Sequence, residues 1–315
     1  MKNEKKGSFL GLLPLIVFLV AYMGTGLGTG SFDNMPLMTG IAIASGVALL
    51  LNKRDKKTPF EEKIALYCKG GGEETLILMV LIFLLAGAFG GVAKGMGAVD
   101  SIVNMGLTIL PGNLILPGIF LIGCLLSFSM GTSMGTVAAL MPIAVDISNK
   151  TGINVCLLAG AVVGGAMFGD NLSMISDTTI AAVKTQGCEM KDKFKANFFI
   201  VLPAAIATIA IFFFMTRNGN FTLTKELPYN VWQILPYIVV LIGALIGINV
   251  FVVLISGTVL SLIVGVATGS IALGDIFIAV GGGTIGDKAI GGVMGMYDIT
   301  VISIVVACIV SLVKE

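Results

Sequence analysis

The residues best suited to chemistry lie in one short run, Gly169 to Thr179, with the sequence GDNLSMISDTT. Two carboxylates, Asp170 and Asp177, stand here inside an otherwise apolar stretch. A carboxylate at membrane depth costs roughly a few kcal/mol and is functional by default. Hydroxyl groups accompany the carboxylates in the same run, at Ser173, Ser176, Thr178 and Thr179. This mixture of oxygen ligands predicts a binding site for a hard cation such as Na⁺, held through Asp170 and Asp177.

The spacing of these groups suggests how they would be presented. If 170–179 is helical, Asp170, Ser173 and Asp177 share one face of the helix. The preceding glycines, Gly169 above all, would let the helix break and free backbone carbonyls. Because burial disfavours the charged form of a carboxylate, a proton could replace Na⁺ at the same oxygens, which is the minimal mechanism of an antiporter. The alternative is structural: Asp170 or Ser173 would only cap a helix.

A second polar run, Gly131 to Thr136, reads GTSMGT and lies within the apolar stretch 113–147. Prolines and glycines make that stretch too irregular for one spanning helix, so we predict a re-entrant hairpin with this run at its tip. Unwound backbone at membrane depth is tolerated where it lines a cavity. The run would contribute helix breaks at Gly131 and Gly135 and neutral oxygens at Thr132, Ser133 and Thr136. The alternative is a small-residue face for helix packing.

The composition of the chain places these runs in a membrane. Of its 315 residues, 56% are apolar and 12% are charged, and the mean hydropathy is +1.02. A soluble domain carries about 25% charged residues, so the sequence predicts an all-α polytopic membrane protein embedded in a lipid bilayer. A net charge of +1 excludes a nucleic-acid binder, which needs a basic surface. The chain has no histidine, which excludes a His-ligated zinc site and a Ser-His-Asp triad. We expect no cofactor.

Apolar runs and basic residues predict the topology. Spanning segments are expected at about 9–24, 35–51, 75–93, 153–183 (interrupted), 197–215, 232–248, 250–268 and 297–313. Lysine and arginine are concentrated in the N-terminal tail, loop 52–74 and segment 184–195, and are sparse in 216–230 and 269–296. The first three should therefore be cytoplasmic and the last two external. This predicts a multi-pass protein of a bacterial-type inner membrane with a cytoplasmic N-terminus. The lysines of 191–195 are interpreted as a solvated, amphipathic linker.

Weak internal matches indicate a repeat. Leu13 to Val17 (LPLIV) recurs as Leu235 to Val239 (LPYIV), and a glycine triplet at 70–72 recurs at 281–283. An odd number of predicted crossings separates the copies, so the second should be inverted, as in many secondary transporters. We therefore divide the chain into a first repeat, 1–230, with hairpin 113–147 and interrupted helix 153–183, and the start of an inverted second repeat, 231–315. The counterpart of 113–183 is missing, so we expect the second repeat to be incomplete and the chain to be a fragment or a shortened relative.

The two motifs together resemble the NhaC-type Na⁺/H⁺ antiporter family. GDNLSMISDTT is similar to the family signature GD-(K/N)-x-S-x-x-SDTT, and GTSMGT is similar to the segment GTS-x-GT that precedes it by about 35 residues. The resemblance implies cation/proton exchange with Asp170, Ser173, Asp177 and Thr178 as site residues, in a protein longer than this chain. Asn171 stands where some members carry lysine, which removes one positive charge beside Asp170.

The leading hypothesis is a secondary transporter, not an enzyme, that exchanges Na⁺ for H⁺. The alternative is a Na⁺-coupled transporter of an organic anion or amino acid, for which the only cationic candidate is Lys94, near Asp100. A membrane-embedded protease or lipid transferase would need aspartates from different helices, whereas Asp170 and Asp177 share one segment. A channel stays open as a further alternative. A homodimer is one of the assemblies that the sequence leaves open.

Overall fold

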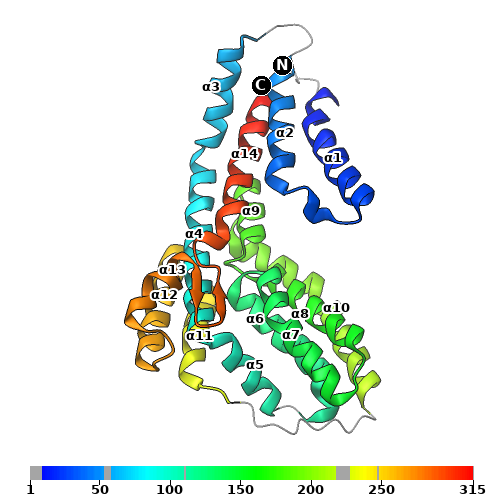
Figure 1. The fold of residues 1–315 in the computed structure, drawn as a ribbon, viewed down its shortest axis with the longest axis vertical. Helices are drawn as coiled ribbons and strands as arrows, with labels where there is room; N and C mark the ends of the chain where they lie inside the picture. The colour runs from blue at the N-terminus through cyan, green and yellow to red at the C-terminus, as the bar shows by residue number, and fades with distance from the viewer. Residues whose placement is uncertain (1–8, 53–57, 110, 218–227, 247, 315) are drawn as a thin grey trace. The chain divides into compact units, whose positions relative to one another are not determined.

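A computed structural model describes residues 9–52, 58–109, 111–217, 228–246 and 248–314. Nearly all of the described chain is helical, and it divides into two compact units (Figure 1). Unit 1 comprises residues 1–80 and 296–315, and unit 2 comprises residues 81–295. The predicted all-α membrane architecture is confirmed. The predicted boundary between sequence repeats at residue 230 differs from the boundaries of these two compact units, and it stays a prediction.

Unit 1 is built from antiparallel and neighbouring helices around the C-terminal helix. Its elements are α1 (Leu13–Thr29), α2 (Leu37–Leu50), α3 (Phe60–Gly71), the first residues of α4 (Glu74–Gly95) and α14 (Tyr297–Lys314). Helix α14 packs against α2 and α3, and α1 packs against α2. Glycine allows the closest of these contacts: a Cβ at Gly70 would lie 2.6 Å from the Ala307 carbonyl oxygen.

The loop expected at 52–74 contains a helix, α3. Pro59 precedes it, Glu61 and Glu62 lie in its first turn, and Lys69 lies in its last turn. Acidic groups at the start and a basic group at the end complement the helix dipole. The abundance of charge predicted a loop outside the membrane, whereas the same charges are placed to stabilise a helix. Lys63 is buried, and its Nζ donates a hydrogen bond to the Leu49 carbonyl at 3.0 Å.

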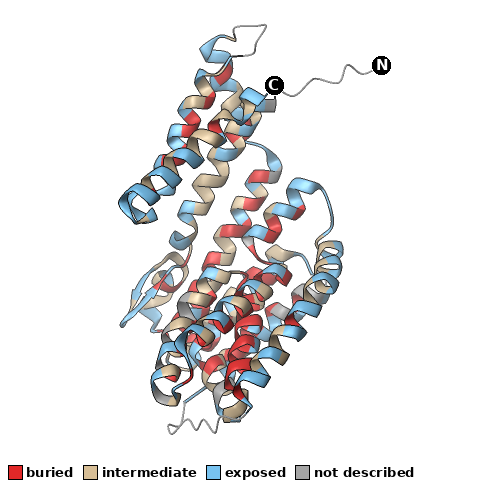
Figure 2. Ribbon diagram, turned by 90° about the vertical axis from the view of Figure 1, so that its right-hand side faces the viewer, coloured by how far each residue is buried: buried red, intermediate tan, exposed pale blue. Residues whose placement is uncertain are grey.

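Unit 2 contains the elements that position the two polar runs. They are the rest of α4, α5 (Ala98–Ile109), α6 (Ile115–Met130), α7 (Ser133–Thr151), α8 (Val155–Leu172), α9 (Asp177–Gln186), α10 (Met190–Thr216), α11 (Val231–Ile246), α12 (Val250–Ala267), α13 (Ile276–Gly281), β1 (Gly283–Ile285) and β2 (Lys288–Ile290). Most residues of α6 are buried, and α8 and α7 pack against it (burial is red in Figure 2). Helix α6 is therefore the centre of the site-bearing part of unit 2.

A short β-hairpin, β1 and β2, lies in the segment expected to be an external loop. Its strands are antiparallel, with Gly283 paired with Ile290 and Ile285 paired with Lys288. The hairpin packs near α4, where a Cβ at Gly91 would lie 2.7 Å from the Cα of Gly292. From it, Lys288 Nζ reaches Asp100 Oδ2 of α5 at 2.5 Å. Asp100 thus forms an ion pair with Lys288 of the hairpin.

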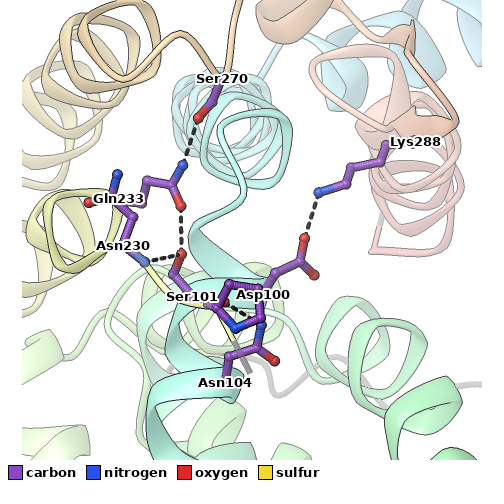
Figure 3. A network of polar contacts seen from close by, with 8 residues as sticks. Asp100, Ser101, Asn104, Asn230, Gln233, Ser270 and Lys288 are labelled. Atoms are coloured by element: carbon purple, nitrogen blue, oxygen red, sulfur yellow. Dashed lines mark hydrogen bonds and ion pairs between the residues drawn. The ribbon is translucent and has the colours of Figure 1, made fainter. Parts of the chain in front are cut away.

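Polar side chains join the start of α11 to α5 and to the end of α12 (Figure 3). Gln233 accepts a hydrogen bond from Ser101 Oγ at 2.5 Å and donates one to Ser270 Oγ at 2.6 Å. The Ser101 hydroxyl also accepts from the backbone N–H of Asn230 at 3.2 Å. This network fixes the chain entering α11, and it carries no charged group of its own.

Seven helices of the described residues are long and apolar enough to cross a membrane. They run over Phe9–Thr29, Leu76–Gly95, Gly112–Met130, Val155–Leu172, Met190–Thr216, Val250–Ala267 and Met294–Val313, and two shorter apolar helices cover Leu37–Leu50 and Val231–Val240. Each spanning segment expected from the sequence overlaps one of these helices. The segments 35–51 and 232–248 overlap the two shorter helices, 153–183 extends beyond Leu172, and residue 247 lies outside the described residues. The stretch expected to be only re-entrant, 113–147, includes one helix, Gly112–Met130, that is long enough to span.

Candidate functional site

The doubled Gly-Thr lies at a sharp turn between two helices. Helix α6 ends at Met130 and is capped by Gly131, which has a left-handed conformation (φ 67°) and whose N–H donates to the Ser127 carbonyl at 2.8 Å. Thr132 caps α7, because its hydroxyl accepts from the N–H of Gly135 at 3.3 Å. The turn lies where the sequence predicts the hairpin tip. Gly135, expected to break a helix, lies instead in the first turn of α7.

The interrupted helix is present, but its break lies later than Gly169. Helix α8 continues to Leu172 and α9 begins at Asp177, so the break covers residues 173–176. Ser173 and Ser176 have extended backbone conformations, with ψ of 137° and 133°. The conditional expectation that 170–179 forms one helical face is therefore wrong. The break instead exposes backbone polar groups between two helix ends.

Gly165 and Gly169 of α8 allow close packing instead of breaking the helix. A Cβ at Gly165 would lie 2.3 Å from the Phe120 carbonyl oxygen, and one at Gly169 would lie 2.2 Å from the Cys124 carbonyl oxygen. The α6 and α8 backbones can approach this closely only because no side chain intervenes. Ser127 Oγ reinforces the contact by donating to the Ala166 carbonyl at 2.6 Å. This close approach places Asp170, the next residue, at the α6–α8 boundary.

The hairpin tip and the helix break contact each other directly. A Cβ at Gly131 would lie 2.8 Å from the carbonyl carbon and oxygen of Ile175, in the middle of the break. Ser173 Oγ donates to the Phe128 carbonyl of α6 at 2.7 Å and accepts from the N–H of Ile175 at 3.3 Å. Two motifs that are about 40 residues apart in the sequence therefore meet in unit 2.

Asp170 is the charged centre of this region. Its side chain is 9% exposed, and its Oδ1 is fully buried with no hydrogen-bond partner among the residues that the structure describes. A buried carboxylate oxygen without a hydrogen-bond donor costs free energy. Such an oxygen is expected to be satisfied by a bound cation or by a proton. The Thr179 hydroxyl lies 3.5 Å from the Asp170 carbonyl oxygen.

The remaining predicted residues fall into two groups. Ser173 and Ser176 are fully buried at the break, and Ser176 Oγ bonds to Thr178 Oγ1 at 2.9 Å and caps α9. Thr136 is buried, but its hydroxyl bonds within α7 to the Thr132 carbonyl at 2.9 Å. Ser133 is the first residue of α7. The backbone of Asp177 begins α9, and its side chain lies outside the described part of the structure.

Sequence reasoning missed two residues of α10 that reach back onto the break. Lys193 Nζ donates to the Asn171 carbonyl oxygen and, at 2.8 Å, to Thr179 Oγ1. Asn197, one turn later, donates from Nδ2 to Asn171 Oδ1 at 2.9 Å. The linker interpretation of 191–195 is therefore wrong for Lys193. Its spacing of four from Asn197, on one face of an apolar helix, was the available signal.

The arrangement offers one described carboxylate and several neutral oxygens. No group of three or more His, Cys, Asp or Glu side chains suited to a metal occurs among the described residues. Hard monovalent cations are bound by such mixed sets of carboxylate, carbonyl and hydroxyl oxygens. The same carboxylate can bind a proton instead. The described part of the site therefore combines one carboxylate with neutral oxygens, a set whose chemistry suits a hard cation or a proton.

Comparison with known proteins agrees with this chemistry. Residues 67–217 match the sequence model of the Na⁺/H⁺ antiporter family. The chain is 25% identical over 244 residues to a malate-2H⁺/Na⁺-lactate antiporter of Bacillus subtilis, covering 73% of this chain and 52% of the relative. It is 26% identical over 218 residues to the Na⁺/H⁺ antiporter NhaC of the same organism, covering 68% and 46%.

A third relative is an arginine/ornithine antiporter, ArcD, of Halobacterium salinarum, which is 26% identical over 221 residues, covering 69% of this chain and 44% of the relative. The chain thus spans about half the length of the curated relatives that it matches. No solved structure matches the chain.

Proposed function

We propose that the chain exchanges Na⁺ for H⁺ as a secondary active transporter, because residues 67–217 match the model of the Na⁺/H⁺ antiporter family and the chain is similar to an NhaC antiporter. The observation that carries the proposal is the buried Oδ1 of Asp170, which has no partner among the described residues. A group that must bind a cation or a proton is the essential part of an exchanger. The similarity to the family supports a transporter. The choice of Na⁺ and H⁺ as substrates is argued from the Asp170 site.

The proposed cycle follows from competition at one carboxylate. On one side of the membrane Asp170 releases its proton and Na⁺ takes its place, with neutral oxygens at the helix break completing the shell. After the site has changed its access, Na⁺ leaves and a proton returns. Since Asp170 cannot hold both ions, each Na⁺ moved requires a proton to move the other way. Asp177 is a second proposed ligand from the sequence motif.

Exchange can be measured in liposomes that hold a pH-sensitive dye. An imposed Na⁺ gradient should move protons in the opposite direction through the wild type, and Asp170→Asn should reduce that movement to the background leak. Asp287→Asn is the matched control, because Asp287 is an exposed carboxylate in the turn between β1 and β2. Proton movement that survives Asp170→Asn in inserted, folded protein would contradict the proposal.

A second candidate is Na⁺-coupled transport of an organic anion or amino acid. It is favoured by the similarity of the chain to two relatives that are named for organic solutes, a malate-2H⁺/Na⁺-lactate antiporter and an arginine/ornithine antiporter. In that case a Na⁺ gradient would drive uptake of labelled malate or arginine into the same liposomes. Two results together would favour this candidate: Na⁺-driven uptake of either solute, and no Na⁺-dependent proton movement when the solute is absent.

We also propose that the protein lies in the cytoplasmic membrane with its N-terminus inside the cell, as the basic loops predict. Cys68 and Cys188 are exposed and lie in segments predicted to be cytoplasmic. As single cysteines in intact cells, both should resist a membrane-impermeant thiol reagent. Tyr229→Cys in an otherwise cysteine-free chain should react, because Tyr229 is exposed in the predicted external loop. Labelling of Cys68 would reverse this orientation.

A further inference from the structure

Lys193 brings a positive charge to the helix break from a different helix. Its side chain is half-buried, and its Nζ bonds to the Asn171 carbonyl oxygen and to Thr179 Oγ1. Asn171 directly follows Asp170, and the Thr179 hydroxyl in turn lies 3.5 Å from the Asp170 carbonyl oxygen. The Lys193 ammonium also interacts electrostatically with the Asp170 carboxylate. The lysine is therefore part of the Asp170 environment.

The position of Lys193 on its helix is specific. Its neighbours Lys191 and Lys195 are exposed. Asn197, one turn after Lys193, bonds to both the carbonyl oxygen and Oδ1 of Asn171 at 3.4 and 2.9 Å. A lysine that only anchored α10 at the membrane surface would extend toward water. Lys193 Nζ instead bonds to oxygens of Asn171 and Thr179, two residues that adjoin or contact the backbone of Asp170.

Those two oxygens are of the kind that Na⁺ uses. A backbone carbonyl and a threonine hydroxyl are neutral, hard ligands. One belongs to the residue after Asp170, and the other lies 3.5 Å from the Asp170 backbone carbonyl oxygen. An ammonium group and Na⁺ carry the same charge and compete for the same lone pairs. Placing both ions among these oxygens would bring like charges together in a region of low dielectric.

We propose that the Lys193 ammonium is a resident cation of the Asp170 site, which occupies the Asn171 and Thr179 oxygens and must leave them when Na⁺ binds. Lys193 is thus a positioning residue that sets how tightly the site holds Na⁺. It keeps the region near neutrality while Na⁺ is absent, and it weakens Na⁺ binding by competition. This inference rests on the proposal that Asp170 binds Na⁺, and it concerns affinity instead of exchange.

The test is Na⁺ binding to the purified chain, measured by titration calorimetry with choline chloride as the ionic-strength control. Lys193→Met keeps an unbranched apolar stem and removes the ammonium. It should tighten Na⁺ binding about tenfold, because Na⁺ no longer displaces hydrogen bonds from a charged donor. Lys191→Met, an exposed lysine of the same helical turn, should leave the affinity unchanged. Lys193→Arg retains a cation and should bind Na⁺ within about threefold of the wild type.

The direction of the change separates this role from a structural one. Loss of a merely structural contact would weaken binding, so weaker or unchanged Na⁺ binding in Lys193→Met would overturn the inference. Absence of Na⁺ binding by the wild type would overturn it as well. If Na⁺ binds, tightens in Lys193→Met and is lost in Asp170→Asn, the inference stands even where liposomes show no proton exchange. That combination would refute the proposed exchange alone.

Discussion

The close approach of α8 to α6 makes Gly169→Ala the most informative packing variant. The new Cβ would lie 2.2 Å from the Cys124 carbonyl oxygen and 2.7 Å from the Phe128 backbone nitrogen, where ordinary contact begins at 3.4 Å. Both atoms belong to the α6 backbone, so no side-chain rotation relieves the clash. The helices must separate, and the contact from Ser127 Oγ to the Ala166 carbonyl must lengthen.

The expected cost follows from two opposing effects. Overpacking in a well-packed interior costs about 1–3 kcal/mol, whereas alanine in place of glycine within a helix gains about 0.5–1 kcal/mol. Gly160→Ala in the same helix is the matched control, because Gly160 is exposed and no described atom lies within 4 Å of the position that its new Cβ would take. It should show the gain alone. We therefore expect Gly169→Ala to be less stable than Gly160→Ala by about 2 kcal/mol.

The assay is unfolding of both variants in the same detergent, followed by circular dichroism, with Na⁺ binding measured on each. Gly169→Ala should also bind Na⁺ more weakly, because displacement of α8 moves the adjacent Asp170. Equal stability and equal Na⁺ binding of the two variants would refute the account of α6–α8 packing and its role in placing Asp170.

Three further outcomes are expected. Gly131→Ala should destabilise the protein more than Gly187→Ala: both glycines have positive φ (67° and 64°), but only Gly131 has a backbone contact, with Ile175, that a Cβ would violate. Equal unfolding midpoints would show that the hairpin tip does not rest on the break. Gln233→Leu should cost about 1–3 kcal/mol, because the hydroxyls of Ser101 and Ser270 each lose one hydrogen bond. Lys288→Met should cost under about 1 kcal/mol, because its ion pair with Asp100 is half-exposed; the reverse order in thermal denaturation would contradict this ranking.

Local chemistry made the helix ends predictable from the sequence. Asn154 caps α8 by accepting from the Cys156 N–H at 2.8 Å, as expected of an asparagine before an apolar run. The Gly-Thr turn was predictable because glycine and a hydroxyl residue end one helix and begin the next. Apolar length predicted the spanning helices, since that signal is summed over about 20 residues.

What could not be predicted depends on contacts between distant segments. Gly169 suggested a helix break. Its lack of a side chain instead lets α8 pack closely against the Cys124 backbone of α6, and only the fold reveals that α6 lies beside α8. Lys193 belonged to a run of charges that resembled a solvated surface, and its partners lie 14 and 22 residues away in the sequence. The resemblance drew attention to the missing lysine at Asn171. It could not show that Lys193 supplies a charge to the same region from another helix.

The central claim is that Asp170 holds either Na⁺ or a proton. It is tested most directly by adding NaCl to the purified protein in weakly buffered solution and recording the protons released, with choline chloride as control. The account predicts that Na⁺ releases protons from the wild type and from Asp287→Asn, and that Asp170→Asn releases none. Saturable Na⁺ binding by the wild type without proton release would contradict it.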